Sequence, residues 1–483
     1  FFSFKKQIMV DMHKKQIYFL STILVKTIEV LLKRCYSFLE QTGWHQLKIF
    51  YGRDKIMMQL NVLKEEISNG KLDNRFYEVY GAKTNLDELK TRLNKLVNSY
   101  EAAFGSDTEV GLFTAPGRTE ICGNHTDHQH GCVLAGAIDL DAIACAAPNG
   151  TNTVRIKSEG YPEIVIDIND FEIKTDEKET SAALVRGVAA RITQLSYDVK
   201  GFNAVISSTV LGGSGLSSSA AYEVLIGVIF NSLFCDGKLT AVQIAQIGQY
   251  AENVYFGKPC GLMDQLASSV GGMVAIDFED TENPIVKKID YDFAKSGYSL
   301  CIIDSGADHA DLTDDYAAIP REMKAVAAHF GKDYLRQVDE DKFWSEIKNI
   351  RKQTGDRAVL RAIHFFADHK HVGEQVAALE NKDFNAFLSC VTRSGHSSAE
   401  RLQNIYCTTR PEQQAVTLTI ETAHKLLAGK GAVRVHGGGF AGTVQAYVPN
   451  GTEEQFKNGM EAVIGEGCCH FLNIRPQGGV ALV

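Results

Sequence analysis

Glycines and short hydroxyl side chains are concentrated in one stretch of the chain, residues 210–221. The apolar run before it, 202–206, predicts a strand, and the spacing of apolar residues over 220–234 predicts a helix. Glycine lets the backbone approach a ligand closely, and a helix N-terminus offers free N–H groups and partial positive charge. The stretch is therefore either a phosphate-binding loop or a flexible turn, and composition does not decide between them.

This loop differs from the two best-known nucleotide-binding loops. No Gly-Lys-Ser/Thr follows its glycines, and it lacks the Gly-x-Gly-x-x-Gly spacing of dinucleotide-binding proteins. A nucleotide bound here would therefore belong to another architecture.

A second polar stretch, residues 116–131, lies between two predicted strands, 110–115 and 133–138. So many Arg, Asn, His and Asp side chains are costly to bury unless they meet a ligand or each other. A guanidinium can neutralise a transferring phosphoryl group, and a carboxylate beside imidazole and amide groups can bind sugar hydroxyls. The alternative is a solvated hairpin loop with a structural Arg–Asp pair. The spacing of the histidines fits no standard metal site.

Two further motifs follow. Asp264 lies in the segment 259–265, after a predicted helix that contains Glu252. A lone Asp near a helix start is usually a cap, but in kinases an Asp can accept the proton of the attacking hydroxyl while a second carboxylate and a serine hold Mg2+. The glycine cluster at 434–443 could close a substrate site or simply form a tight turn.

Together these motifs resemble those of the GHMP small-molecule kinases, and among them the galactokinase family. The family's Gly-Leu-Ser-Ser-Ser-Ala is complete at 215–220, its Pro-Cys-Gly-Ile-Met-Asp-Gln is kept at 259–265 with Leu262 for Ile, and its Gly-rich turn is matched at 437–442. Its first signature, Gly-Arg-x-Asn-Leu-Ile-Gly-Glu-His-Thr-Asp, is matched by Gly117, Arg118, Gly123, His125, Thr126 and Asp127. The resemblance spans about residues 110–448.

The resemblance implies a role for each motif. Asp264 would be the catalytic base, Arg118 its charge-stabilising partner, and Ser219 and Glu252 the contacts of Mg2+. The residues expected to hold the phosphates of ATP are Gly212, Gly213, Ser214, Gly215, Leu216, Ser217 and Ser218. The residues expected to face the sugar are Asn124, His125, Asp127, Tyr316, Gly438 and Gly439. Phosphate would pass from ATP to the anomeric hydroxyl of galactose, giving galactose 1-phosphate and ADP.

The sequence departs from the family pattern around the sugar. Asn124 replaces the Glu before His-Thr-Asp, Glu120 replaces the Asn after Gly-Arg-x, His128 and Gln129 replace Tyr-Asn, and a paired Arg-Arg is reduced to Arg321. Such changes can shift the preference among sugars, because a site discriminates by leaving buried groups unpaired. Two alternatives therefore stay open: a kinase for another sugar such as N-acetylgalactosamine, and a non-catalytic sensor that binds galactose and ATP. Retention of the catalytic pair favours catalysis.

Alternation of helical and strand patterns predicts an α+β protein. The resemblance implies the two-lobed GHMP kinase fold, with a mixed-sheet N-terminal lobe of ribosomal protein S5 domain 2-like type, a ferredoxin-like C-terminal lobe and the active site between them. We expect a basic extension at 1–58, which is either a start placed too far upstream or a disordered segment, a helical preamble at 59–104, and lobes at 105–280 and 281–483. The charged, Pro-containing segment 279–292 is expected to be a boundary or surface loop.

The amino-acid composition indicates which partners and which cellular compartment to expect. Of 483 residues, 23% are charged and 45% hydrophobic, as in ordinary globular enzymes, and the net charge of -9 argues against nucleic acid. The 11 cysteines contain no Cys-x-x-Cys pair, which suits a reducing cytosol. The apolar run 17–32 is interrupted by Lys26 and Glu29 and is too short to span a membrane. We expect a cytoplasmic enzyme with a small-molecule sugar substrate, no nucleic acid or membrane partner, and a monomeric state slightly favoured.

Overall fold

The computed structural model describes residues 57–483 apart from 211, 213–214 and 308–311. The chain divides into two units, of which residues 55–483 form one. Most of the predicted basic extension, and the predicted phosphate contacts Gly213 and Ser214, therefore lie outside the described residues. Among the helices that are described, none has the length and apolar character that a membrane span requires.

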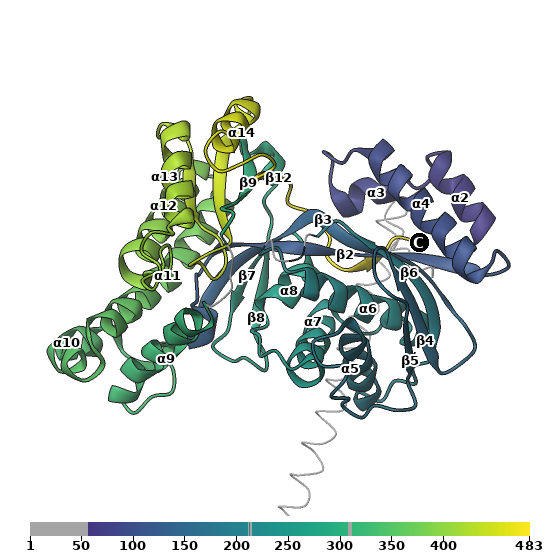
Figure 1. The fold of residues 1–483 in the computed structure, drawn as a ribbon, viewed down its shortest axis with the longest axis horizontal. Coiled ribbons are helices and arrows are strands. Elements are labelled where there is room, and N and C mark those ends of the chain that lie inside the picture. The colour runs from purple at the N-terminus through teal and green to yellow at the C-terminus, as the bar shows by residue number, and fades with distance from the viewer. Residues whose placement is uncertain (1–56, 211, 213–214, 308–311) are drawn as a thin grey trace, which may run out of the picture. The chain divides into compact units, whose positions relative to one another are not determined.

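A nine-stranded mixed sheet forms the centre of this unit (Figure 1). Its main path runs in the order β1 (Met58–Gln59), β2 (Glu109–Cys122), β3 (Cys132–Pro148), β6 (Phe202–Ser208), β4 (Thr153–Ser158) and β5 (Ile164–Asp167). β7 (Met273–Asp277) and β8 (Ile285–Ile289) extend it from β3, and β13 (Val480–Ala481) pairs with β2. The β2–β3 pair is antiparallel, whereas β4 and β6 are parallel.

Helices cover both faces of this sheet. Alternate residues of a strand point to opposite faces, so Ile143 and Cys145 of β3 pack with the N-terminal helices while Ala142 and Ala144 pack with the opposite layer. The N-terminal helices are α2 (Leu60–Ser68), α3 (Asp73–Tyr80) and α4 (Leu86–Phe104). The opposite layer contains α5 (Ser181–Gln194), α6 (Ser218–Phe234), α7 (Ala241–Tyr250), the π-helix η2 (Ala251–Phe256) and α8 (Met263–Val270).

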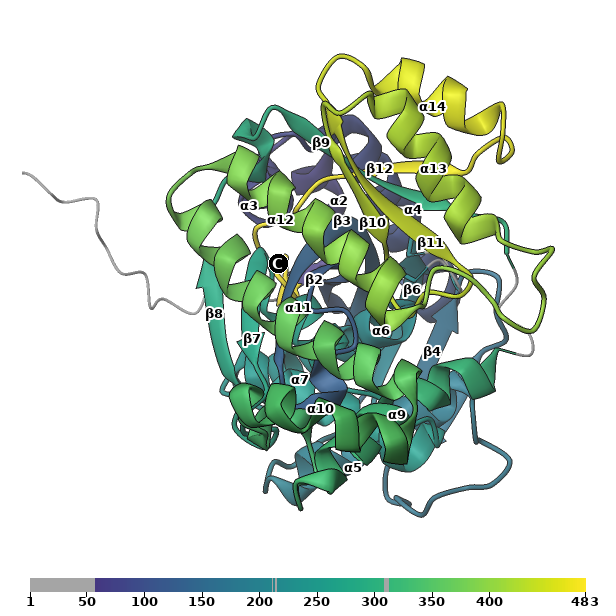
Figure 2. The same cartoon turned by 90° about the vertical axis from the view of Figure 1, so that its left-hand side faces the viewer.

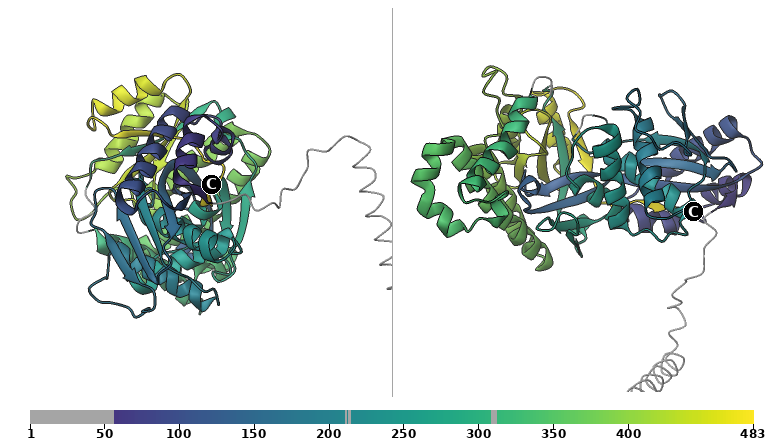
Figure 3. Two further views of the ribbon diagram at one scale, coloured as in Figure 1. Left: turned by 90° about the vertical axis from the view of Figure 1, so that its right-hand side faces the viewer. Right: turned by 90° about the horizontal axis from the view of Figure 1, so that it is seen from below.

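The segment predicted as a helical preamble, residues 59–104, contains α2, α3 and α4. Asn85 caps α4 by accepting a hydrogen bond from the backbone N–H of Glu88, and the leucine stripe of α4 is buried against the sheet. The C-terminus lies beside these helices, as Figure 3 shows, and Leu482 belongs to the same core. The first and last described segments of the chain thus share one hydrophobic cluster.

A second, four-stranded antiparallel sheet has the order β10 (Ala432–Val435), β11 (Thr443–Pro449), β9 (Tyr298–Asp304) and β12 (Cys469–Leu472). Tyr447 packs with α12 (Phe384–Ser397) on one face, whereas Val444 and Ala446 pack with α13 (Ala415–Leu427) and α14 (Glu453–Glu461) on the other. The remaining helices are α9 (Thr313–His329), α10 (Glu340–Thr354) and α11 (Asp356–Glu380). Figure 2 views the molecule from the side of α9 to α12.

Two expectations about loops are wrong. The segment 279–292 contains β8, which pairs with β7 along its length, so the first sheet continues past the predicted boundary at residue 280. β8 is an edge strand and carries the exposed Lys287 and Lys288. Because edge strands are often charged, its sequence is similar to that of a surface loop. The polar stretch 116–131 is also not all loop, because its first half completes β2.

Candidate active site

Arg118 and Asp264 form the centre of the site. Arg118 lies on β2, and Asp264 lies in the first turn of α8. The guanidinium Nε and Nη2 donate to Asp264 Oδ1 and Oδ2 at 2.6 and 2.8 Å, a bidentate ion pair. Nη1 donates to the Gly215 carbonyl at 2.5 Å, and the Ser217 hydroxyl donates to Asp264 Oδ2. Three sequence motifs that are far apart along the chain therefore meet at one carboxylate.

Asp264 is ionised and reachable. Burial would raise the pKa of Asp264, but the charge of Arg118 and the hydrogen bonds from Arg118 and Ser217 hold it below its usual range. The side chain is nevertheless 32% exposed. A charged carboxylate with one open side is suited to accept a proton from a bound hydroxyl.

The loop before α6 has the geometry of an anion site. Gly215 and Ser217 have φ angles of +69° and +58°, in the left-handed region. Ser217 occupies the N-cap position of α6, but its side chain makes no capping bond to the helix, because its hydroxyl bonds to Asp264. The first-turn N–H groups of α6 thus donate no hydrogen bond to the cap side chain, and unpaired N–H groups of this kind can bind anions.

β2 touches this loop backbone to backbone. The N–H of Arg118 donates to the Leu216 carbonyl at 3.1 Å, and a Cβ on Gly117 would lie only 2.8 Å from that oxygen. A side chain at position 117 would separate the strand from the loop. The glycine therefore allows the Arg118–Asp264 pair to lie beside the loop that precedes α6.

Ser219 and Glu252 lie together on neighbouring helices. Ser219 Oγ is 3.4 Å from Glu252 Oε1, and Glu252 is 3% exposed within η2. Mg2+ usually takes one or two protein oxygens and completes its shell with phosphate and water oxygens, so this hydroxyl and carboxylate suit it. Within the described residues no group of three or more His, Cys, Asp or Glu side chains could hold a metal.

The sugar loop presents His125 and Asp127. His125 has φ +59°, and its Nε2–H donates to the Gly438 carbonyl at 2.9 Å. Burial, and then the nearby His128, lower the pKa of His125 to about 4, so the ring is neutral and its Nδ1 remains an acceptor. Asp127 is half-buried, and its Oδ2 lies 2.7 Å from where a Cβ of Gly261 would be. Asp127 is thus held near the segment that leads to Asp264, whereas His125 is held by the glycine turn.

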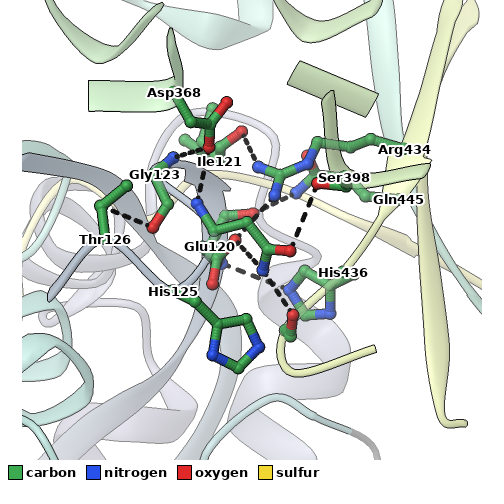
Figure 4. A network of polar contacts seen from close by, with 12 residues as sticks. Glu120, Ile121, Gly123, His125, Thr126, Asp368, Ser398, Arg434, His436 and Gln445 are labelled. Atoms are coloured by element: carbon green, nitrogen blue, oxygen red, sulfur yellow. Dashed lines mark hydrogen bonds and ion pairs between the residues drawn. The ribbon is translucent and has the colours of Figure 1, made fainter. Parts of the chain in front are cut away.

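Asn124 does not have a group left for a sugar. Its side chain is fully buried, and its amide nitrogen donates to Glu120 Oε1 and to the Gly437 carbonyl at 3.1 and 2.6 Å. Its Oδ1 accepts from Asn404 Nδ2 and the Ser398 hydroxyl at 2.8 and 3.3 Å. Since all four positions are filled, the expectation that Asn124 faces the substrate is wrong for this structure. Figure 4 shows the network, with the ring of His125 directed away from it.

Tyr316 contacts the glycine turn at residues 437–442. Its hydroxyl donates to the Gly439 carbonyl at 2.6 Å, and its ring packs edge-on against Phe440. A Cβ on Gly438 would lie 2.5 Å from the ring, so only glycine fits there. Burial raises the pKa of Tyr316 to about 12, which keeps its hydroxyl a neutral donor. His125 and Tyr316 therefore meet at Gly438 and Gly439, while Asp127 lies beside Gly261.

Sequence reasoning missed the groups that support the sugar loop. Asp368 Oδ2 accepts from the backbone N–H groups of Gly123 and Asn124 at 3.2 and 2.8 Å, and His364 Nε2 lies 2.8 Å from the Asn124 carbonyl. The i, i+4 spacing of His364 and Asp368 places both on one face of α11. That spacing was the available signal, but it does not reveal a partner more than 200 residues away.

A buried ion pair and a neutral histidine complete the network. Arg434 Nη2 donates to Glu120 Oε1 at 2.8 Å, and both residues are buried. Burial raises the pKa of Glu120 although the charge of Arg434 opposes the shift. His436 Nε2 accepts from the Glu120 N–H at 3.3 Å, and burial followed by the charge of Arg118 lowers the pKa of His436 well below its usual value.

Comparison with known proteins agrees with this geometry. A family model described as the galactokinase galactose-binding signature matches residues 98–148, and one for the GHMP kinases N terminal domain matches residues 183–272. The galactokinase of Streptomyces coelicolor is 30% identical over 346 residues, which cover 71% of this chain and 86% of that protein.

Solved structures share the fold. The crystal structure of Lactococcus lactis galactokinase complexed with galactose has a TM-score of 0.69 at 23% identity, covering 80% of this chain and 99% of that one. The Methanococcus jannaschii mevalonate kinase has a TM-score of 0.54 at 14% identity, covering 75% and 98% of the two chains. The α+β GHMP kinase fold expected from the motifs is therefore confirmed.

Proposed function

Because the chain belongs to the galactokinase family, we propose that it transfers the γ-phosphoryl group of ATP to the anomeric hydroxyl of galactose. The products are galactose 1-phosphate and ADP. The observation that carries the proposal is the bidentate Arg118–Asp264 pair, which touches the phosphate loop through Gly215 and Ser217. A proton acceptor and a phosphate site within one hydrogen-bond network are what phosphoryl transfer to a hydroxyl requires.

Each part of the site has one task in this reaction. Asp264 takes the proton of the sugar hydroxyl as its oxygen attacks the γ-phosphorus, and the bond to the β,γ-bridging oxygen breaks. Arg118 fixes both carboxylate oxygens and places positive charge beside the transferring group. The phosphate loop and the N-terminus of α6 hold the remaining phosphates of ATP.

Ser219 and Glu252 are the residues that would hold Mg2+. The ion would neutralise charge on the phosphate oxygens. A buried carboxylate whose free oxygen faces a serine hydroxyl fits such an ion, because Mg2+ prefers hard oxygen ligands.

His125, Asp127 and Tyr316 are proposed to face the sugar, beside Gly438 and Gly439. Asn124 instead holds the loop, so its replacement of a glutamate does not place a new amide against the substrate. This favours galactose over another sugar such as N-acetylgalactosamine. The open side of Asp264 favours an enzyme over a non-catalytic sensor. The ten described cysteines are all free thiols, and we place the enzyme in the reducing cytoplasm.

A coupled assay of ADP release across a panel of sugars tests the proposal. We expect turnover with galactose that is at least tenfold faster than with glucose or N-acetylgalactosamine. Faster turnover with another sugar would reassign the substrate. Binding of galactose and ATP without ADP release would favour the sensor.

A further inference from the structure

A buried amide lies between two carboxylates where three helical elements meet. Gln265 follows Asp264 on α8, and its Nε2 donates to Glu223 Oε2 on α6 and to Glu252 Oε2 on η2, at 2.9 Å each. Gln265 and Glu223 are fully buried and Glu252 is 3% exposed. The amide nitrogen thus donates both of its hydrogens to acidic side chains. It also makes a longer contact of 3.6 Å with Cys260 Sγ.

The surrounding backbone makes room for this arrangement. A Cβ on Gly248 of α7 would lie 3.1 Å from Glu223 Cβ and 3.4 Å from Gln265 Cγ, so a larger residue there would push these side chains apart by a few tenths of an ångström. Directly after α7 the chain changes to the π-helix η2, which contains Glu252. Such π-turns are frequent at functional sites because they redirect a side chain.

The arrangement is costly if its only purpose is stability. Two carboxylates share a dry site, and Glu223 Oε1 and Gln265 Oε1 have no hydrogen-bond partner among the described residues. Gln265 donates to one carboxylate oxygen of Glu252, Oε2, and not to the other. The other oxygen, Oε1, lies 3.4 Å from Ser219 Oγ. Gln265 therefore determines which oxygen of Glu252 faces the metal-binding side.

We propose that Gln265 and Glu223 are positioning residues that orient Glu252 for the divalent cation accompanying ATP. The hydrogen bond to Glu223 fixes the orientation of the Gln265 amide, and the hydrogen bond from that amide fixes the orientation of the Glu252 carboxylate. The inference rests on the proposed function, which assigns the metal contacts to Ser219 and Glu252. Partners behind a metal ligand typically change metal affinity 10- to 100-fold when they are lost.

The test measures metal binding without turnover. Mn2+ binding to the full-length protein is followed by electron paramagnetic resonance in the presence of a non-hydrolysable ATP analogue. Gln265→Met removes both donors at similar length, and we expect at least tenfold weaker Mn2+ binding. Gln246→Met, the same substitution on α7 where the amide donates to the Glu282 carbonyl, is the matched control and should bind Mn2+ like the wild type.

A double variant separates positioning from stability. Gln265→Met removes the donor that Glu223 and Glu252 share and should lower the thermal midpoint, whereas adding Glu223→Leu removes one buried acidic side chain and should restore much of it. Mn2+ binding should stay weak in the double variant, because Glu252 still lacks its amide. Recovery of metal binding together with stability would show a purely structural role and overturn the inference.

The remaining outcomes distinguish this inference from the proposed function. Unchanged Mn2+ binding by Gln265→Met, with normal binding by the wild type, overturns the inference alone. A wild type that binds no Mn2+ with the analogue overturns the metal assignment on which the inference rests. A wild type that binds Mn2+ with the expected dependence but phosphorylates no sugar supports the inference while the proposed function fails.

Discussion

Two arginine–carboxylate pairs each include one residue of β2, Arg118 or Glu120, and they differ in their exposure to solvent. Arg118 pairs with Asp264, whose side chain is 32% exposed, whereas Glu120 pairs with Arg434 at side-chain exposures of 6% and 0%. The first pair keeps an open side, and the second is enclosed by the network around Asn124. A carboxylate that exchanges a proton must be reachable, while one that holds a loop is better enclosed.

The difference predicts different consequences of mutation. Changes at Asp264 should reduce the rate and leave the fold largely intact, because its side chain is partly open to solvent and Arg118 keeps its hydrogen bond to the Gly215 carbonyl. Changes at the enclosed pair should reduce stability first, because an unpaired buried charge costs several kcal/mol. The variants below test this division.

Asp264→Asn should have the largest effect. Without a proton acceptor, ADP formation with galactose should fall at least about 1,000-fold, which corresponds to about 4 kcal/mol of activation free energy. ATP binding by calorimetry and the thermal midpoint should change little. Turnover within tenfold of the wild type would contradict the assignment of Asp264 as the base.

Glu120→Gln should mainly weaken the fold. Arg434 would lose the carboxylate of Glu120 while remaining buried, and we expect the free energy of unfolding to fall by about 3 kcal/mol. Urea denaturation measures this change. Glu163→Gln is the matched control, because its partner Arg155 is exposed and such pairs contribute about 0–1 kcal/mol. Equal losses in the two variants would remove the contrast between the buried and exposed pairs.

Stability should also fall as the pH is lowered from about 6.5 to 4. The pKa of His125 is about 4 in the folded state, below the ordinary value near 6.5, so in this range the unfolded chain binds the extra proton. Its contribution is up to about 1.4 kcal/mol per pH unit, and His436 acts in the same direction. Urea denaturation at pH 7, 6 and 5 should show this trend; constant stability would show that these rings are not held neutral.

Tyr316→Phe should have the smallest effect. The ring can keep its packing on Phe440, and the lost hydroxyl bond to Gly439 corresponds to about 1 kcal/mol. We expect the KM for galactose to rise about fivefold while the KM for ATP stays the same. Tyr161→Phe, at a 77% exposed tyrosine, should change neither. A larger rise in the KM for ATP than in the KM for galactose would indicate that Tyr316 contacts the nucleotide and not the sugar.

The sequence by itself determined the elements and the open pair. Periodicity predicted the strand at 202–206 and the helix at 220–234, which the structure places at Phe202–Ser208 and Ser218–Phe234. The motifs identified Arg118 and Asp264 because glycines, hydroxyls and a nearby carboxylate form recognisable local patterns. These features depend on residues close together in the chain, where backbone preference and spacing are visible.

Only the tertiary structure decided the rest. It assigned Asn124 to the loop's support and β8 to the first sheet, and it brought Asp368 to a backbone N–H that lies 244 residues earlier. Such contacts leave no local pattern, because a buried hydrogen bond is satisfied by any suitably placed group regardless of its position in the chain. Whether a carboxylate is open or enclosed depends on everything packed around it, so two arginine–carboxylate pairs on one strand differ in exposure, and only the more open pair is proposed to take part in the chemistry.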